Sequence, residues 1–145
     1  MKAKQLLLIA AATLCLAGVS GTAYAQDDDD DGHVFSVSTY QWPFETLEEI
    51  FAIMEENQDL VEQNEYILSR KILTHNWAGN FSVMFVIEYA SMADLAKSQD
   101  RGTELFEAKY PDEDDRETRG DTFAELTGRT MHVDNILQEN VALTK

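Results

Sequence analysis

The chain has 145 residues, one cysteine and a formal net charge of −16 at pH 7. This length corresponds to a single domain that is large enough to bury a core of its own. No Lys or Arg occurs between residues 26 and 69, and so acidic a surface repels phosphate backbones and anionic lipid head groups. Binding to nucleic acid or to a membrane surface is therefore excluded as an expected function.

Residues 1–25 have the pattern of a cleavable secretory signal peptide. Lys2 and Lys4 precede an apolar run over residues 6–19, and a small-residue site follows at residues 23–25. A membrane anchor is disfavoured because a spanning helix needs about 20 apolar residues, and this run is shorter. We expect an exported protein, periplasmic or secreted, whose mature form lacks cysteine and has no membrane attachment.

Residues 26–32 are predicted to be a disordered acidic leader. The spacing of Asp27, Asp29, Asp31 and Gly32 matches the first half of a calcium loop. The bidentate Glu that closes such a loop would fall at position 38, which is Ser38. Because an uninterrupted acidic run also repels itself and stays hydrated, the leader is favoured over a calcium site, and no cofactor is expected.

The remaining segment, residues 33–145, is predicted to be one domain. Residues 33–42 are rich in β-branched and aromatic side chains and stop before Pro43, which predicts a strand. From residue 44 onward apolar side chains recur every three to four positions among glutamates, which predicts an amphipathic helix ending between residues 57 and 64.

Residues 66–77 and 81–90 predict the two strands of a hairpin. The second strand is apolar on both faces and should lie inside the sheet. A two-residue turn at Gly79-Asn80 would place Lys71 opposite Glu88 as a cross-strand ion pair. Such a pair could take part in proton transfer, although structural ion pairs are the commoner reason for this arrangement.

The last third of the chain predicts a second crossover. Ser91 and Asp94 are spaced as a helix cap, and a helix with a second helical piece follows as far as Pro111. Residues 112–126 form an acidic segment with few apolar side chains, and residues 131–137 alternate apolar and polar side chains as a final strand does.

This β-α-β-β-α-β order predicts an α+β, ferredoxin-like fold: a four-stranded antiparallel sheet with both helices on one face. Both sides of the sheet are expected to be apolar, because Phe35 opposes Val34 and Tyr40 on the first strand, while Met84 and Val86 give the third strand a second apolar face. The side that needs a second cover is expected to carry Val34, Tyr40, Met84 and Val86. One layer of helices covers only one face. We therefore expect a homodimer that pairs through the sheet.

Four segments carry a resemblance to a known family: Thr39-Tyr40-Gln41-Trp42; Leu73-Thr74-His75-Asn76-Trp77-Ala78-Gly79; Glu88-Tyr89-Ala90-Ser91 leading to Asp94; and His132-Val133-Asp134 with the closing Leu143-Thr144-Lys145. With them, residues 33–145 resemble the dimeric α/β-barrel superfamily of antibiotic-biosynthesis-monooxygenase-like and stress-responsive barrel domains, in particular its small exported bacterial members without an assigned activity. The resemblance implies paired sheets and a pocket in each subunit. Its motifs are mostly structural and fix no reaction.

The residues predicted to line a ligand pocket are Tyr40, Trp42, Lys71, His75 and Trp77. Aromatic side chains of this kind suit an apolar or planar small molecule, but they also serve as core and interface packing. Some members of the superfamily degrade haem with an Asn, a Trp and a His from separate elements. Here these residue types are adjacent on one strand, where neighbours point to opposite faces, so the triad is not carried over.

The catalytic candidates are His75, His132 and Glu88. His132 and Asp134 share a strand face, but no cluster has the spacing of a metal site, and none is expected. The leading hypothesis is an exported domain that binds a small apolar or aromatic molecule. The alternatives are a cofactor-independent oxygenase or isomerase with a histidine base, and an acidic structural or interaction protein without a ligand.

Overall fold

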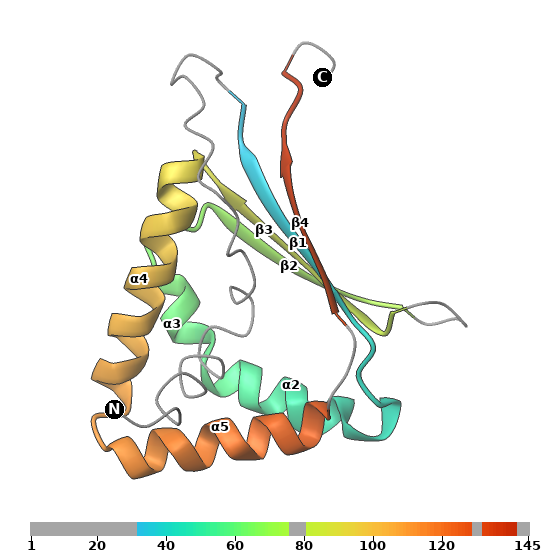
Figure 1. Ribbon diagram of the computed structural model, residues 1–145, viewed down its shortest axis with the longest axis vertical. Helices are drawn as coiled ribbons and strands as arrows, with labels where there is room; N and C mark the ends of the chain where they lie inside the picture. Colours follow the sequence, from blue (N-terminus) through green and yellow to red (C-terminus); the bar gives the residue numbers. More distant parts are fainter. Residues whose placement is uncertain (1–31, 76–80, 129–131, 142–145) are drawn as a thin grey trace, which may run out of the picture.

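The computed structural model describes residues 32–75, 81–128 and 132–141. Over these residues the chain forms a four-stranded antiparallel sheet with the helices on one side of it (Figure 1). The strands are β1 (Val34–Tyr40), β2 (Ser69–Thr74), β3 (Val83–Tyr89) and β4 (His132–Gln138). The helices are η1 (Phe44–Thr46), α2 (Leu47–Glu56), α3 (Gln58–Glu62), α4 (Met92–Lys109) and α5 (Glu113–Thr127).

The strand order in the sheet is β2-β3-β1-β4. Together with the helical crossovers between β1 and β2 and between β3 and β4, this order confirms the predicted ferredoxin-like fold. It also places β3 between β2 and β1, as its two apolar faces predict. In the described part of the chain, no helix is both long and apolar enough to cross a membrane.

The hairpin register differs from the prediction by two residues. Lys71 lies opposite Val86, and Ser69 is the residue opposite Glu88. The predicted Lys71–Glu88 cross-strand pair is therefore wrong, because it assumed a turn at residues 79–80, which lie outside the described residues. Glu88 instead accepts a hydrogen bond from Ser69 Oγ at 2.5 Å and contacts His33 Nδ1 at 2.6 Å.

The helices also differ in detail from the prediction. The segment after Ser91 is one continuous helix, α4, and not two pieces. Ser91 caps it as predicted, since its Oγ accepts from the Asp94 N–H at 3.1 Å. The acidic segment, which was expected to bury little besides Phe123 and Leu126, is the 15-residue helix α5; it buries Phe123 and Thr127 and packs Leu126 against the core. Its cap is Asp112, whose Oδ1 accepts from the Asp115 N–H.

The core lies between the sheet and the helices. Its strand residues are Val34, Tyr40, Val83, Phe85, Ile87 and Tyr89, all buried. Val34 and Tyr40 therefore need no second cover, which corrects the sequence-based grouping: alternate residues of β1 point to opposite faces, and these two point toward the helices.

The other face of the sheet carries no helix (Figure 1). Its centre is apolar and half-buried, and consists of Phe35 and Val37 from β1 and Met84 and Val86 from β3. The flanking strands add Leu73, Val133 and Leu137, which are 49%, 55% and 52% exposed. We call these seven residues the open face. It is the apolar surface on which the expectation of a paired sheet depends.

Candidate functional site

The structure describes four of the five residues that were predicted to line a pocket, and they lie on both sides of the sheet. Tyr40 and Trp42 are 8% and 3% exposed and lie in the core on the helix side of the sheet. Lys71 lies on the opposite side, in register with Val86. His75 follows β2 and is half-buried, and Trp77 lies outside the described residues.

Tyr40 and Trp42 are the centre of an aromatic cluster. The ring of Trp42 lies 4.8 Å from Tyr40, 5.7 Å from Phe85 and 5.9 Å from Phe123, measured between centroids. Both contacts with phenylalanine are edge-to-face, a favourable arrangement for aromatic rings. These two side chains hold β1 against α5, and in this respect they belong to the packing of the fold.

The catalytic candidates lie apart from one another. His132 is on the helix side of β4, where its Nε2 lies 3.2 Å from Asp134 Oδ2 and its ring stacks on Tyr40 at 5.5 Å. Glu88 is on the opposite side of the sheet, since it is in register with Phe35. The two cannot act on one substrate within a single subunit. No group of three or more metal-ligating side chains occurs among residues 32–75, 81–128 and 132–141.

The hydrogen bonds from Ser69 and from His33 hold the pKa of Glu88 below its usual value of 4.5. They favour the ionised carboxylate, because each stabilises the charge more than the neutral form. A carboxylate with a lowered pKa is a weaker base, and the position of Glu88 therefore suits a structural ion pair.

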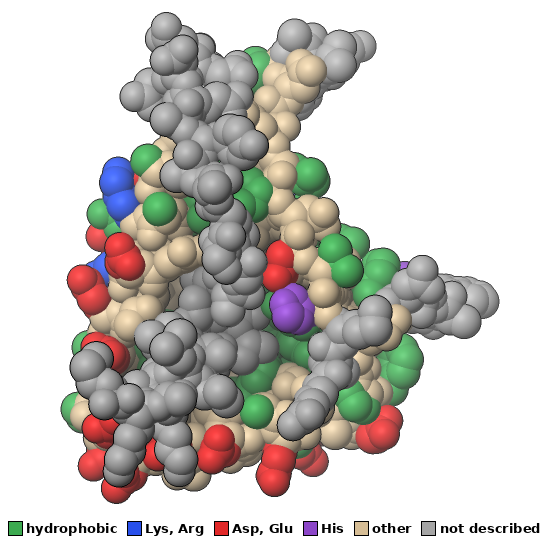
Figure 2. Space-filling model, in the orientation of Figure 1, with side chains coloured by type: hydrophobic (Ala, Val, Ile, Leu, Met, Phe, Trp, Pro, Cys, Tyr) green, Lys and Arg blue, Asp and Glu red, His purple; other side chains and the backbone are tan. Residues whose placement is uncertain are grey.

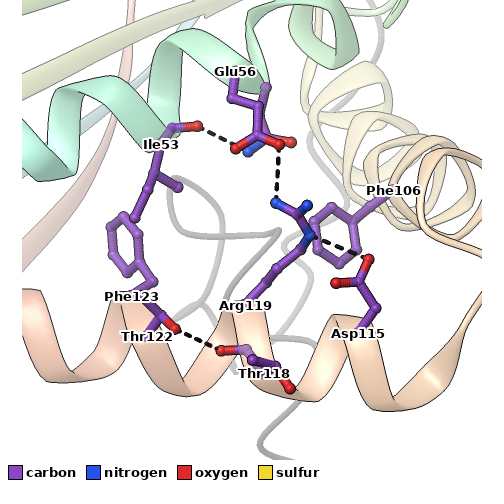
Figure 3. A pocket seen from close by; sticks show the side chains of 9 residues that line it. Ile53, Glu56, Phe106, Asp115, Thr118, Arg119, Thr122 and Phe123 are labelled. Carbon is purple, nitrogen blue, oxygen red and sulfur yellow. Dashed lines mark hydrogen bonds and ion pairs between the residues drawn. The ribbon is translucent and has the colours of Figure 1, made fainter.

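The structure shows a cavity that the sequence analysis missed. Its volume is about 360 Å³, and it lies between the C-terminal half of α2, the end of α4 and one face of α5 (Figure 3). The lining residues are Ile53, Glu56, Asn57, Phe106, Asp115, Thr118, Arg119, Thr122 and Phe123. Four of the five α5 residues, Asp115, Thr118, Arg119 and Thr122, have the helical spacing i, i+3, i+4, i+7. Because these four are polar, a search for apolar stripes does not find them.

The floor of the cavity is aromatic and continuous with the core. Phe106 and Phe123 are 7% and 5% exposed. Phe123 also belongs to the aromatic cluster around Trp42, and Ile53 packs against the same cluster. A molecule in the cavity would therefore rest on rigid, closely packed side chains.

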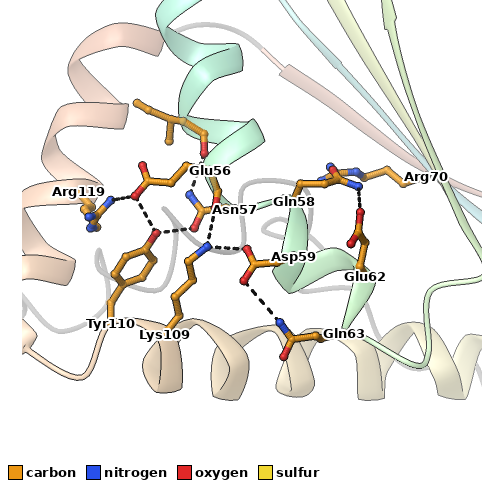
Figure 4. A network of polar contacts seen from close by, with 11 residues as sticks. Glu56, Asn57, Gln58, Asp59, Glu62, Gln63, Arg70, Lys109, Tyr110 and Arg119 are labelled. Atoms are coloured by element: carbon orange, nitrogen blue, oxygen red, sulfur yellow. Dashed lines mark hydrogen bonds and ion pairs between the residues drawn. The ribbon is translucent and has the colours of Figure 1, made fainter.

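Arg119 dominates the polar rim. Its Nη1 donates to Glu56 Oε1 at 3.0 Å, its Nε donates to Asp115 Oδ2 at 3.3 Å, and its guanidinium stacks on Tyr110, 4.1 Å from the ring centroid (Figures 3 and 4). Although burial favours the neutral form, the hydrogen bond with Asp115 and the charge of Glu56 raise the pKa of Arg119 above its usual range. Arg119 is therefore charged at every physiological pH.

A second layer of contacts holds this rim in place. Tyr110 Oη donates to Asn57 Oδ1 at 2.9 Å, and Asn57 Nδ2 donates to the carbonyl of Ile53 at 2.8 Å (Figure 4). Lys109 Nζ bridges the carbonyl of Glu56 and Asp59 Oδ1. These contacts join α4 to the junction of α2 and α3, so the cavity has a defined shape before any ligand arrives.

Comparison with known proteins identifies the fold. No family model and no curated protein matches the chain. Among solved structures, a dimeric ferredoxin-like protein from an uncultured marine organism is similar, with a TM-score of 0.52, 13% identity, and coverage of 76% of this chain and 97% of that one. A second dimeric ferredoxin-like protein from an uncultured marine organism gives 0.51 at 15% identity, covering 75% and 90%.

The cofactor-independent oxygenase SnoaB of Streptomyces nogalater is also similar, with a TM-score of 0.50, 8% identity, and coverage of 80% of this chain and all of that one. At such identities the likeness concerns the fold alone. It confirms the ferredoxin-like fold that the sequence predicts.

Proposed function

We propose that this protein is an exported domain that binds a small, partly apolar molecule in the cavity between α2, α4 and α5, and that two copies pair through the open face. The observation that carries the binding function is the cavity itself. Its volume of about 360 Å³ falls within the range of small-molecule sites, roughly 300–1,000 Å³.

The lining has the composition of a binding site. The buried rings of Phe106 and Phe123 offer apolar surface to a ligand, and apolar burial supplies most of the affinity of small molecules. The charged groups of Glu56, Asp115 and Arg119 converge on the rim and would orient the ligand. Since these groups are already fixed by hydrogen bonds, little ordering is required when the ligand binds.

The test is binding of small aromatic molecules to the mature chain, followed by NMR chemical shifts. We expect 3-phenylpropan-1-ol to shift signals of α2 and α5. Thr122→Phe, which fills the cavity from its exposed rim, should abolish the shifts. The matched control is Ala124→Phe, which adds the same ring to an exposed position of α5 outside the cavity and should leave binding unchanged. Equal binding by both variants would reject the site.

The pairing of two copies has two supports. The open face is an apolar surface without a cover in one copy, and two structures with the same fold are described as dimeric. Export rests on the N-terminal pattern of residues 1–25. N-terminal sequencing of the protein recovered outside the cytoplasm should begin at Gln26.

One observation favours a second candidate, an enzyme with a histidine base. Asp134 holds His132 through its Nε2, and Tyr40 supports the imidazole ring. A carboxylate in this position orients an imidazole for proton transfer. A similar structure, SnoaB, is described as a cofactor-independent oxygenase. If this function holds, His132→Gln and Asp134→Asn should each remove oxygen uptake with an aromatic substrate, whereas Thr122→Phe should leave it intact.

A further inference from the structure

Most polar side chains that line the cavity offer a ligand hydrogen-bond acceptors, and the donors are confined to Asn57 and Arg119. The hydroxyl hydrogens of Thr118 and Thr122 are donated to the carbonyls of Asp114 and Thr118, at 2.8 and 2.9 Å. Each hydroxyl can then only accept a further hydrogen bond. Asn57 donates one of its two amide hydrogens to the carbonyl of Ile53. The other amide hydrogen and the N–H groups of Arg119 that do not bond Glu56 or Asp115 are the remaining donors.

The carboxylates keep unused capacity. Arg119 and Tyr110 bond to Oε1 of Glu56, and Arg119 bonds to Oδ2 of Asp115. Within the described part of the chain, no hydrogen bond reaches Oε2 of Glu56 or Oδ1 of Asp115. Since a carboxylate accepts about four hydrogen bonds, both can receive a donor from a ligand without losing Arg119.

The charge around the cavity is negative. Its lining contains two carboxylates and one guanidinium, and the N-terminal turn of α5 adds Glu113 and Asp114. Figure 2 shows acidic side chains gathered along the lower edge of the molecule, where α5 runs. A cleft within a field of one sign concentrates ions of the opposite sign. An anion would have to compete with both carboxylates for Arg119.

We propose that the ligand of this cavity is an organic cation, with an apolar or aromatic body on Phe106 and Phe123 and an ammonium group bound by Glu56 and Asp115. This inference rests on the proposed function, because it names the class of ligand for the same cavity. The ammonium group would donate hydrogen bonds to the free carboxylate oxygens of the rim, and the apolar body would cover the two buried rings.

The experiment compares three probes of equal shape by titration calorimetry on the mature chain: 3-phenylpropylammonium, 3-phenylpropan-1-ol and 3-phenylpropanoate. The ammonium should bind about fivefold more tightly than the alcohol, which is the effect of one close charge pair in a water-like medium, and the carboxylate should bind most weakly. Added salt should reduce the difference between the ammonium and the alcohol, because these carboxylates are partly exposed.

Substitutions on α5 distinguish a site for cations from a site for anions, because they change the affinity for the charged probes in opposite directions. Arg119→Met removes the internal cation and keeps much of the side-chain length, so it should tighten the ammonium several-fold. If the cavity were a site for anions, Arg119→Met would instead abolish the binding of 3-phenylpropanoate. Asp115→Asn should weaken the ammonium about fivefold. Asp121→Asn, an equal change of charge at an exposed position of α5 outside the lining, should have less effect, and circular dichroism checks that each variant is folded.

The outcomes separate the inference from the proposed function. If the alcohol binds but the ammonium shows no advantage, or the carboxylate binds best, the cation is excluded while the cavity remains a binding site. If no probe binds to a folded chain, the proposed function fails and the inference fails with it. An effect of Asp121→Asn as large as that of Asp115→Asn would show a general electrostatic attraction and overturn the assignment to the rim.

Discussion

One buried serine positions the aromatic cluster. Ser82 Oγ accepts from the Trp42 N–H at 2.7 Å and donates to the Tyr40 carbonyl at 3.2 Å, and its own N–H donates to the same carbonyl at 2.7 Å. The chain leaves β1 between Tyr40 and Trp42, where regular strand pairing has ended. Ser82 therefore replaces the missing strand partner and fixes the backbone that carries the indole ring.

We predict that Ser82→Ala lowers the free energy of unfolding by about 1–3 kcal/mol, because the buried N–H of Trp42 loses its acceptor. Urea unfolding followed by tryptophan fluorescence measures this loss. Ser36→Ala on β1 is the control: Ser36 is half-buried, and its loss should be within about 0.5 kcal/mol. Similar losses in both variants would show that Ser82 has no special part in holding Trp42.

Glu88 makes the stability depend on pH. Its folded-state pKa lies below 4.5 because Ser69 and His33 bond to the carboxylate. The unfolded chain then binds the proton more readily than the folded chain does. The stabilisation is thus fully present above pH 4.5 and is lost as the pH falls through the lower folded-state value.

We predict that the unfolding free energy of the wild type falls more steeply below about pH 4.5 than that of Glu88→Gln. The measurement is a series of urea unfolding curves between neutral and acidic pH. Glu107→Gln, at an exposed position of α4, should keep the wild-type slope. Parallel curves for the wild type and Glu88→Gln would contradict this origin of the acid sensitivity.

At the scale of elements, α5 is a long helix with a small apolar anchor. It buries Phe123 and Thr127 and packs Leu126 against the aromatic cluster. The rest of its attachment is polar, through Arg119 to Glu56 and through Arg116 Nη1 to the Tyr110 carbonyl. Exposed polar contacts contribute little to stability, so the packing of Phe123 determines whether α5 stays docked.

We predict that Phe123→Ala costs about 3–5 kcal/mol and raises hydrogen exchange in α5 before it does so in β3. Mass spectrometry of exchanged peptides resolves the two segments. Phe44→Ala is the matched control, because Phe44 is 66% exposed and its loss should be within about 0.5 kcal/mol. An equal rise in β3 and α5 would show that α5 does not open on its own.

These elements also show how far local sequence reasoning extends. The alternation of β3 and the cap at Ser91 are local signals, and both are found in the structure. The sequence of α5 shows no apolar stripe that would predict how the helix packs. Its attachment depends on contacts with residues of α2 and α4, which lie outside its own segment. The hairpin register depended on the geometry of one turn, and an error of two residues there displaced the predicted partner of Lys71.

The candidate site could not be predicted for a similar reason. The cavity draws Ile53, Phe106 and Phe123 from three different helices, α2, α4 and α5. No spacing along the chain links them. The predicted pocket residues were selected by aromatic and histidine content, and such residues are as often core as site. Tyr40 and Trp42 are core side chains whose cluster supports the cavity from beneath.

The whole molecule is a two-layer structure with one bare face. The helices cover the side of the sheet that carries Val34 and Tyr40, while the open face has an apolar centre of Phe35, Val37, Met84 and Val86. The flanking strands add both polar side chains, Ser69 and Lys71, and the exposed apolar side chains of Leu73, Val133 and Leu137. An uncovered apolar surface of this kind is typical of a protein interface, and a second copy offers a surface of the same composition.

We predict that the mature chain sediments as a dimer and that Val86→Lys weakens the dimer by at least about tenfold, because an unpaired charge at an apolar contact has to be desolvated. Analytical ultracentrifugation over a range of concentrations measures this shift. Phe44→Lys places the same charge on an exposed apolar residue of η1, away from the open face, and should leave the dimer intact. Circular dichroism separates dissociation from unfolding. A wild-type chain that stays monomeric at high concentration would contradict pairing through the open face, since the sheet would then tolerate contact with water.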